Sequence, residues 1–137
     1  MVESRHVLRV PATLTGLHDA TGSLLDLLEA QHLPDAARYN VELAFEEIVA
    51  NIVRHGRPTA DIDVTILFGD ADTILTFEDD GIPFNPCEQT VPPPPASLDE
   101  AKVGGLGIPL IKAISTRMEY ERTPENRNRL LVAIPAS

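Results

Sequence analysis

The 137-residue sequence has one cysteine, no tryptophan and few aromatic side chains, which make up 4% of the chain. The single thiol, Cys87, excludes an internal disulfide and agrees with a reducing compartment. Basic residues are also scarce, since 11 Lys and Arg stand against 21 Asp and Glu and give a net charge of −10. Because so acidic a surface repels phosphate backbones, we expect no direct nucleic-acid binding. The negative charge is more compatible with a basic protein partner.

Long apolar runs are absent as well. No stretch approaches the roughly 18 residues of a membrane helix, and the first ten residues, MVESRHVLRV, lack the apolar region of a secretory signal. We therefore expect a cytoplasmic protein with no membrane partner. The length and the 43% hydrophobic content predict a single folded domain over residues 1–137.

Hydrophobic periodicity and turn residues predict five strands and three helices. In order these are a strand at 6–12, a helix from Thr13 or Thr15 to about His32, a helix from Pro34 to Gly56, strands at 62–68 and 73–79, a long loop at 82–105, a helix at 106–115, and strands at 117–122 and 129–135. The hairpins in the middle and at the end favour an α+β two-layer sandwich. Its sheet should be mixed, largely antiparallel, and covered by helices on one face.

Three polar residues follow one another at i, i+4 and i+8 on the second predicted helix: Glu47, Asn51 and His55. Such a row can supply a proton acceptor, an oxygen ligand for a hard cation and a group near phosphate. A solvated polar helix face explains the same spacing, and taken alone it is the better explanation.

Two further patterns allow both an ordinary and a functional interpretation. Asp79 and Gly81 follow the end of a predicted strand. They could form an ordinary acidic turn. Alternatively, Asp79 could accept a hydrogen bond from an exocyclic amine while Gly81 lets a flat base approach the backbone. A glycine cluster, Gly104, Gly105 and Gly107, stands just before and at the start of a predicted helix. It could be a flexible helix entrance, or its backbone N–H groups could bind phosphate. Neither a P-loop nor a dinucleotide fingerprint is present.

The order of the three patterns is more specific than any one of them. A helix with E-x-x-x-N-x-x-x-H-G, a strand ending in D-x-G-x-P-F, and G-x-G before a helix resemble the nucleotide-binding module of the GHKL ATPases. The stretches ELAFEEIVANIVRHG, DDGIPFNP and GGLGIPLIKAIS are most similar to the small anti-sigma factor serine/threonine kinases. This resemblance covers roughly residues 35–135 and implies a Bergerat-type ATP-binding fold with a nucleotide lid at about 82–105.

The resemblance also implies roles for single residues. Asn51 matches the asparagine that holds Mg²⁺ against the phosphates of ATP, and Glu47 matches the general base. Asp79 matches the aspartate that reads adenine, with Gly81 behind the base. The implied phosphate-side residues are His55, Lys102, Gly104, Gly105 and Gly107.

One departure from the family keeps two functions open. The family often has an arginine just before its lid glycines, whereas this sequence has Val103 and Gly104 there, and Lys102 is the nearest cation. The resemblance implies an ATP- and Mg²⁺-dependent kinase that phosphorylates a STAS-type anti-sigma factor antagonist and sequesters a sigma factor, and it suggests a homodimer. The departure leaves a nucleotide-gated binding module with little or no kinase activity as the alternative.

Overall fold

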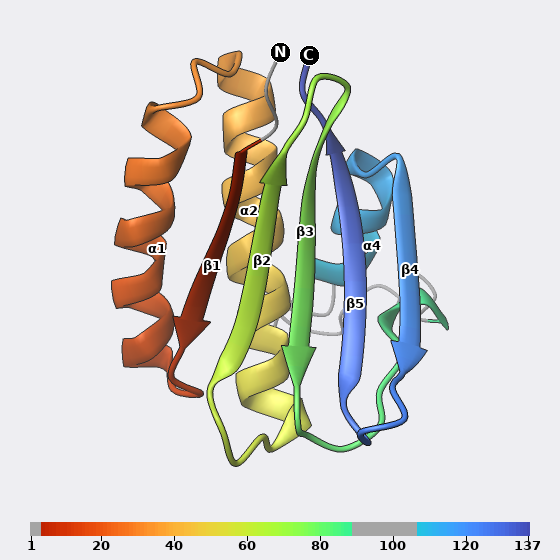
Figure 1. Ribbon diagram of the computed structural model, residues 1–137. Helices are drawn as coiled ribbons and strands as arrows, with labels where there is room; N and C mark the ends of the chain where they lie inside the picture. The colour runs from red at the N-terminus through yellow and green to blue at the C-terminus, as the bar shows by residue number, and fades with distance from the viewer. Residues whose placement is uncertain (1–3, 89–106) are drawn as a thin grey trace, which may run out of the picture.

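The computed structural model describes residues 4–88 and 107–137, which form a sheet covered by helices on one face (Figure 1). The elements in chain order are β1 (Ser4–Val10), α1 (Leu14–Glu29), α2 (Asp35–Asn51), the π-helical turn η1 (Ile52–Gly56), β2 (Ile62–Phe68), β3 (Asp72–Asp79), the 3₁₀ turn η2 (Pro86–Glu88), α4 (Gly107–Ile114), β4 (Arg117–Arg122) and β5 (Asn128–Pro135). The predicted order of elements and the two-layer α+β fold are confirmed. In the described ranges, no helix is both long enough and apolar enough to cross a membrane.

The strands form one sheet in the order β1-β2-β3-β5-β4, and each neighbouring pair is antiparallel. The expectation of a largely antiparallel sheet is therefore confirmed. Two helices separate β1 from β2, so the chain returns in the opposite direction beside β1. A single described helix precedes β4, which consequently runs in the same direction as β3, but β5 lies between these two strands (Figure 1).

The core lies between the sheet and the helices. Burial alternates along β2 and β3, as expected for strands with one covered face. The fully buried large side chains come from both layers and include Val10, Leu24, Leu28, Val41, Phe45, Ile48, Ile62, Ile66, Leu75, Phe77, Ile111 and Ile134. The same cluster joins α1, α2 and α4 to the sheet, so α2 is fixed on both sides.

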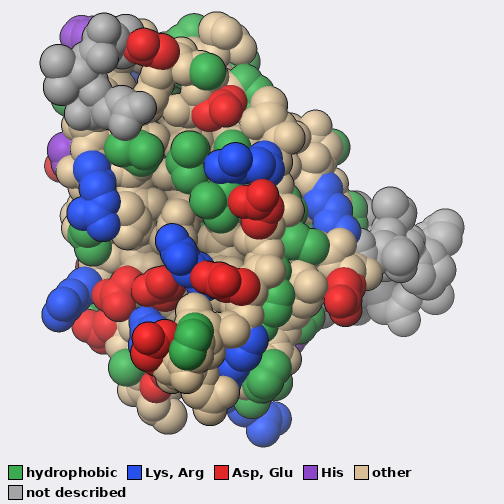
Figure 2. Space-filling model, turned by 45° about the vertical axis from the view of Figure 1, so that its right-hand side comes forward, with side chains coloured by type: hydrophobic (Ala, Val, Ile, Leu, Met, Phe, Trp, Pro, Cys, Tyr) green, Lys and Arg blue, Asp and Glu red, His purple; other side chains and the backbone are tan. Residues whose placement is uncertain are grey.

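The open face of the sheet carries paired charges at one end. Strand register places Arg9 opposite Asp63, and Arg129 between Glu78 and Glu121. The corresponding N–O distances are 3.7, 3.5 and 3.3 Å. Figure 2 shows acidic and basic side chains intermingled on this side of the molecule. Such half-exposed pairs stabilise a fold only slightly, so we assign them a role in solubility and strand register.

Local signals decide where α1 begins and ends. Of the two candidate capping threonines, Thr13 is the cap, because its Oγ1 accepts a hydrogen bond of 2.9 Å from the Gly16 N–H. The helix ends at Glu29, slightly before the expected end near His32. His32 itself has a left-handed φ of 56°, which is incompatible with a continuing helix.

Two glycines of α1 should respond in opposite ways to the same substitution. Gly22 is exposed with open space around it, so Gly22→Ala should raise the free energy of unfolding by about 0.5–1 kcal/mol. A Cβ on Gly16 would lie 2.4 Å from the Pro11 carbonyl oxygen, so Gly16→Ala should lower it by about 1–3 kcal/mol. Urea unfolding followed by circular dichroism measures both changes, and equal effects would contradict this packing.

Candidate active site

The polar row on α2 is straight only in part. Glu47 and Asn51 are both half-buried and lie one α-helical turn apart. The next residues, which include His55, form the π-helical turn η1. His55 is exposed, and Arg57 ends the turn with a left-handed φ of 51°. Glu47 and Asn51 therefore lie on adjacent turns of one helix face, and His55 lines neither the pocket beside Asn51 nor the cavity beside Glu47.

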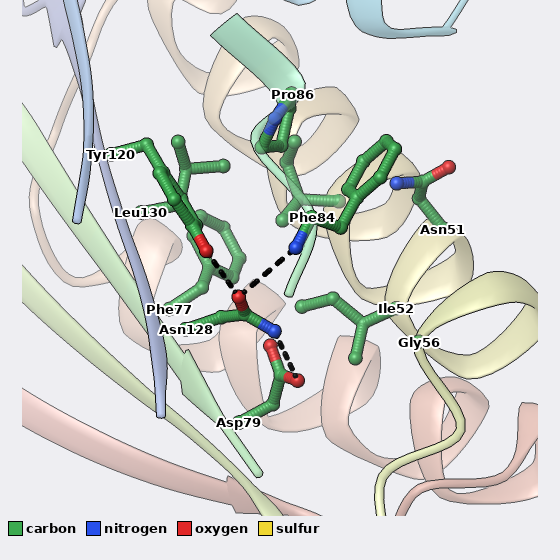
Figure 3. Close-up of a pocket in the computed structure, with 11 residues that line it drawn as sticks. Asn51, Ile52, Gly56, Phe77, Asp79, Phe84, Pro86, Tyr120, Asn128 and Leu130 are labelled. Atoms are coloured by element: carbon green, nitrogen blue, oxygen red, sulfur yellow. Dashed lines mark hydrogen bonds between the residues drawn. The ribbon is translucent and has the colours of Figure 1, made fainter. Parts of the chain in front are cut away.

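A pocket lies beyond Asn51, between the end of α2, the ends of β3 and β5, and the segment that precedes η2 (Figure 3). The residues that line it are Ile48, Asn51, Ile52, Gly56, Phe77, Asp79, Phe84, Pro86, Tyr120, Asn128 and Leu130. Apolar side chains dominate, and a few polar groups converge among them. This composition is typical of a small-molecule site, where apolar walls hold a ring and polar groups select it.

Asn128, at the start of β5, is the centre of the polar groups in this pocket. Its Nδ2 donates to Asp79 Oδ1 at 3.2 Å and to the Ile82 carbonyl oxygen at 2.8 Å. Its Oδ1 accepts from the Phe84 N–H at 3.3 Å and from the Tyr120 hydroxyl at 2.5 Å (Figure 3). Two donors and two acceptors use the whole capacity of a carboxamide. The side chain, which is 7% exposed, is therefore fixed in orientation.

Asp79 presents one committed and one available oxygen. The residue is 3% exposed, and its Oδ1 accepts from the Gly81 N–H at 2.8 Å as well as from Asn128. Its Oδ2 accepts no hydrogen bond from the described residues. In the described part of the chain, Thr73 Oγ1 is the one fully buried side-chain polar atom without a partner. Asp79 Oδ2 is not such an atom, so it is not fully buried. A ligand in the pocket can therefore donate to Oδ2.

Gly81 is required by close packing. A Cβ at this position would lie 2.3 Å from the Gly56 carbonyl oxygen and 2.7 Å from Asp79 Oδ1. The same carbonyl accepts a hydrogen bond of 2.8 Å from the Ile82 N–H. The turn after β3 is thus held directly against the end of η1. Gly81 lies behind Asp79 and Gly56, which line the pocket, and does not line it itself.

Asp80 holds the same two segments together from outside. Its Oδ1 accepts from the backbone N–H groups of Thr59 and Ala60 at 2.8 and 3.2 Å, and its Oδ2 accepts from the Thr59 hydroxyl. These hydrogen bonds, led by the one from the Thr59 hydroxyl, hold the pKa of Asp80 below its usual value. The charged form of Asp80 therefore stabilises the wall behind Asp79.

Glu47 lies outside this pocket and beside the start of α4. A Cβ on Gly107 would lie 2.4 Å from Glu47 Oε2, so the carboxylate touches the first residue of that helix. A negative charge is favourable at this end of a helix. The structure thus brings Gly107 against Glu47, one helical turn from Asn51. Lys102, Gly104 and Gly105 lie outside the described residues, as does most of the predicted lid at 82–105.

The pocket is narrow in this conformation. The cavity volume is about 30 Å³, which is room for water and not for a purine ring. Phe84 and Pro86 line it together with residues of α2 and of the sheet (Figure 3). This segment is the described beginning of the predicted lid, and admission of a larger ring would require it to shift.

Two residues of the site carry no recognisable motif. Asn128 and Tyr120 become visible only through strand pairing, which places Asn128 opposite Asp79 and opposite Arg122. A weak signal does exist, because Asn128 occupies an inward position in a strand whose other inward residues are apolar. Such a residue must find partners in the interior.

Comparisons with known proteins show what this chain is similar to. The histidine kinase-like ATPase domain family matches residues 10–134. Serine/threonine-protein kinase BtrW of Bordetella bronchiseptica is 28% identical over 126 residues, which are 89% of this chain and 88% of that protein. A chain in the SiaB-SiaC complex from Pseudomonas aeruginosa has a TM-score of 0.61 at 14% identity, over 95% of this chain and 89% of that chain. At this identity the structural likeness concerns the fold.

The lowered pKa of Asp80 predicts a pH-dependent contribution to stability. Since the folded pKa lies below the unfolded value of about 3.9, the contribution is complete above that value and is lost as the pH falls through the folded pKa. Asp80→Asn should therefore lower the melting temperature by the same amount at about pH 7 and pH 5. Below about pH 4, the melting temperatures of the variant and the parent should lie closer together. Thermal unfolding across this range measures the effect. Asp70→Asn, on the exposed β2–β3 turn, is the control, and a pH-independent difference for Asp80→Asn would contradict a role for its charge.

Proposed function

The chain belongs to the histidine kinase-like ATPase domain family, and from this premise we propose that it is an ATP-dependent serine/threonine protein kinase. In this proposal it is a cytoplasmic anti-sigma factor that phosphorylates a STAS-type anti-sigma factor antagonist. It sequesters a sigma factor until the antagonist displaces that factor. The similarity to a Bordetella protein named as a serine/threonine-protein kinase supports this class of reaction.

One arrangement carries the proposal. Asp79 offers an available oxygen at one end of an apolar pocket, and Asn51 lines the same pocket from α2. Glu47 follows one helical turn away, with its carboxylate at the start of α4. A base reader, an oxygen donor and a proton acceptor therefore lie in the order that base, phosphates and acceptor hydroxyl require.

Asp79 accounts for the choice of base. The exocyclic amine of adenine can donate to Asp79 Oδ2, while the ring lies against the apolar walls of the pocket. Guanine has a carbonyl oxygen at the corresponding position, so two acceptors would face each other. A site built to accept a hydrogen bond rejects such a ligand strongly, because its buried polar group would remain unpaired. We therefore assign ATP as the nucleotide.

The oxygen ligands that the site offers are suited to Mg²⁺ bound together with the nucleotide. The described residues contain no group of three or more His, Cys, Asp or Glu side chains that could hold a metal ion. Asn51 supplies one carboxamide oxygen beside the pocket, and Mg²⁺ is commonly bound by one or two protein oxygens together with substrate phosphates and water. Bound there, the ion would neutralise charge on the transferring phosphoryl group. In the proposal Lys102, Gly104, Gly105 and Gly107 complete the phosphate side.

Glu47 is the proposed general base. Its carboxylate accepts the proton of a serine or threonine hydroxyl as the bond from that oxygen to the γ-phosphorus forms. The bond between the γ-phosphorus and the bridging oxygen breaks, and ADP leaves. Because the chemistry of phosphoryl transfer is mostly positioning and charge neutralisation, one base beside the nucleotide suffices.

Replacing Glu47 separates a kinase from a nucleotide-gated binder. Glu47→Gln should keep ATP affinity, because the side chain does not line the nucleotide pocket. It should lower the phosphorylation rate about 10²- to 10⁴-fold, which is the usual contribution of a general base. The assay follows acid-stable labelled phosphate from ATP onto the STAS-type protein encoded nearest to this chain. Glu29→Gln, at the exposed end of α1, is the control. Parental activity in Glu47→Gln would favour the binding module instead.

A further inference from the structure

A second cavity lies on the other side of α2, between α1 and α2. Its volume is about 320 Å³, which is within the range of ligand sites and roughly ten times that of the first pocket. Leu17 and Thr21 line it from α1, and Glu46 and Glu47 line it from α2. Arg54 of η1 lies at one end. We call this cavity the α1–α2 groove.

Glu47 connects the groove to the site of phosphoryl transfer. Its carboxylate touches Gly107 and also lines the groove, whereas Asn51, one turn further along α2, lines the nucleotide pocket. The two cavities share no lining residue in the described part of the chain, so α2 is the partition between them. An acceptor hydroxyl must reach the base while ATP remains bound. The groove offers a route that does not pass through the nucleotide pocket.

The groove presents charges of both signs that form no ion pair within residues 4–88 and 107–137. None of the ion pairs found in the described residues includes Glu46, Glu47 or Arg54. Partial burial, together with the nearby charges of Glu42 and Glu47, raises the pKa of Glu46. A cation placed beside Glu46 would relieve this repulsion, and an anion would suit Arg54. The charge pattern thus favours a polar protein segment as the occupant.

We propose that the α1–α2 groove receives the phosphoacceptor segment of the partner protein, a stretch with a serine or threonine hydroxyl and a neighbouring Lys or Arg. The hydroxyl lies at Glu47 and the basic side chain lies against Glu46. Leu17 and the buried Ala50 provide the apolar surface beneath the segment. This inference rests on the proposed function, because it states where the acceptor of that reaction binds.

A matched pair of tryptophan variants tests the groove. Thr21 is half-buried in the groove, so Thr21→Trp would fill it. Ser23 is exposed on the same helix, about 200° further around the axis, so Ser23→Trp adds the same bulk elsewhere. With the STAS-type protein encoded nearest to this chain as substrate, Thr21→Trp should raise the KM for that protein at least about tenfold through steric exclusion. The KM for ATP should stay at the parental value in both variants.

A charge variant keeps the test independent of folding in Thr21→Trp. Glu46→Lys should also raise the KM for the protein substrate and leave ATP affinity unchanged, with Glu29→Lys as the charge control. Parental KM values for both groove variants, each folded by circular dichroism, would overturn the proposal. If the parent transfers no phosphate, the kinase function fails. In that case, calorimetry measures the affinity of this protein for the STAS-type protein in the presence of a non-hydrolysable ATP analogue. Weaker binding by Thr21→Trp and Glu46→Lys than by the parent supports the groove, and unchanged binding overturns it.

Discussion

The candidate site depends on one buried carboxamide, that of Asn128. Its four hydrogen bonds join the end of β3, the segment after it, and β4 to the start of β5. Removing any partner would leave buried polar groups unpaired, at a cost of about 1–3 kcal/mol each. This constraint commits Oδ1 of Asp79 to the protein and leaves Oδ2 for a ligand. The same amide ties Phe84, which lines the pocket, to Asp79, the proposed reader of the base.

Helix α2 gives the molecule its second organising feature. Asn51 lines the nucleotide pocket, and Glu47, one turn earlier on the helix, lines the α1–α2 groove. The helix is packed into the core from both the sheet and the other helices, so it can act as a rigid partition. The proposed donor and acceptor of phosphate therefore reach adjacent turns of α2 through two different cavities. Steric separation of this kind allows ATP and a protein substrate to be bound together.

The sequence predicts most of the fold because its strongest signals are local. Alternation in β2 and β3, the Thr13 cap and the spacing of Glu47 and Asn51 all depend on residues close in the chain. The role of Asn128 depends on pairing with Asp79, 49 residues away, which no local pattern encodes. The packing of Gly81 against the Gly56 carbonyl is likewise a tertiary contact.

His55 illustrates a different limit of sequence analysis. The prediction places it on a continuous α-helix, whereas residues 52–56 form a π-helical turn. The side chain is exposed and does not line the pocket in this conformation, so its role near the phosphates stays a prediction. The lid positions, Lys102, Gly104 and Gly105, stay predictions because they lie outside the described residues.

The central claim is that Asn128 holds Asp79 in the orientation that reads adenine. A double-mutant cycle on ATP affinity, measured by calorimetry for Asp79→Asn, Asn128→Ala and the double variant, tests it most directly. Each single substitution should weaken binding, and the second should cost little once the first is present. We expect a coupling of at least about 1 kcal/mol, as for residues in one hydrogen-bond network. Additive losses, or parental affinity in Asn128→Ala, would contradict the claim.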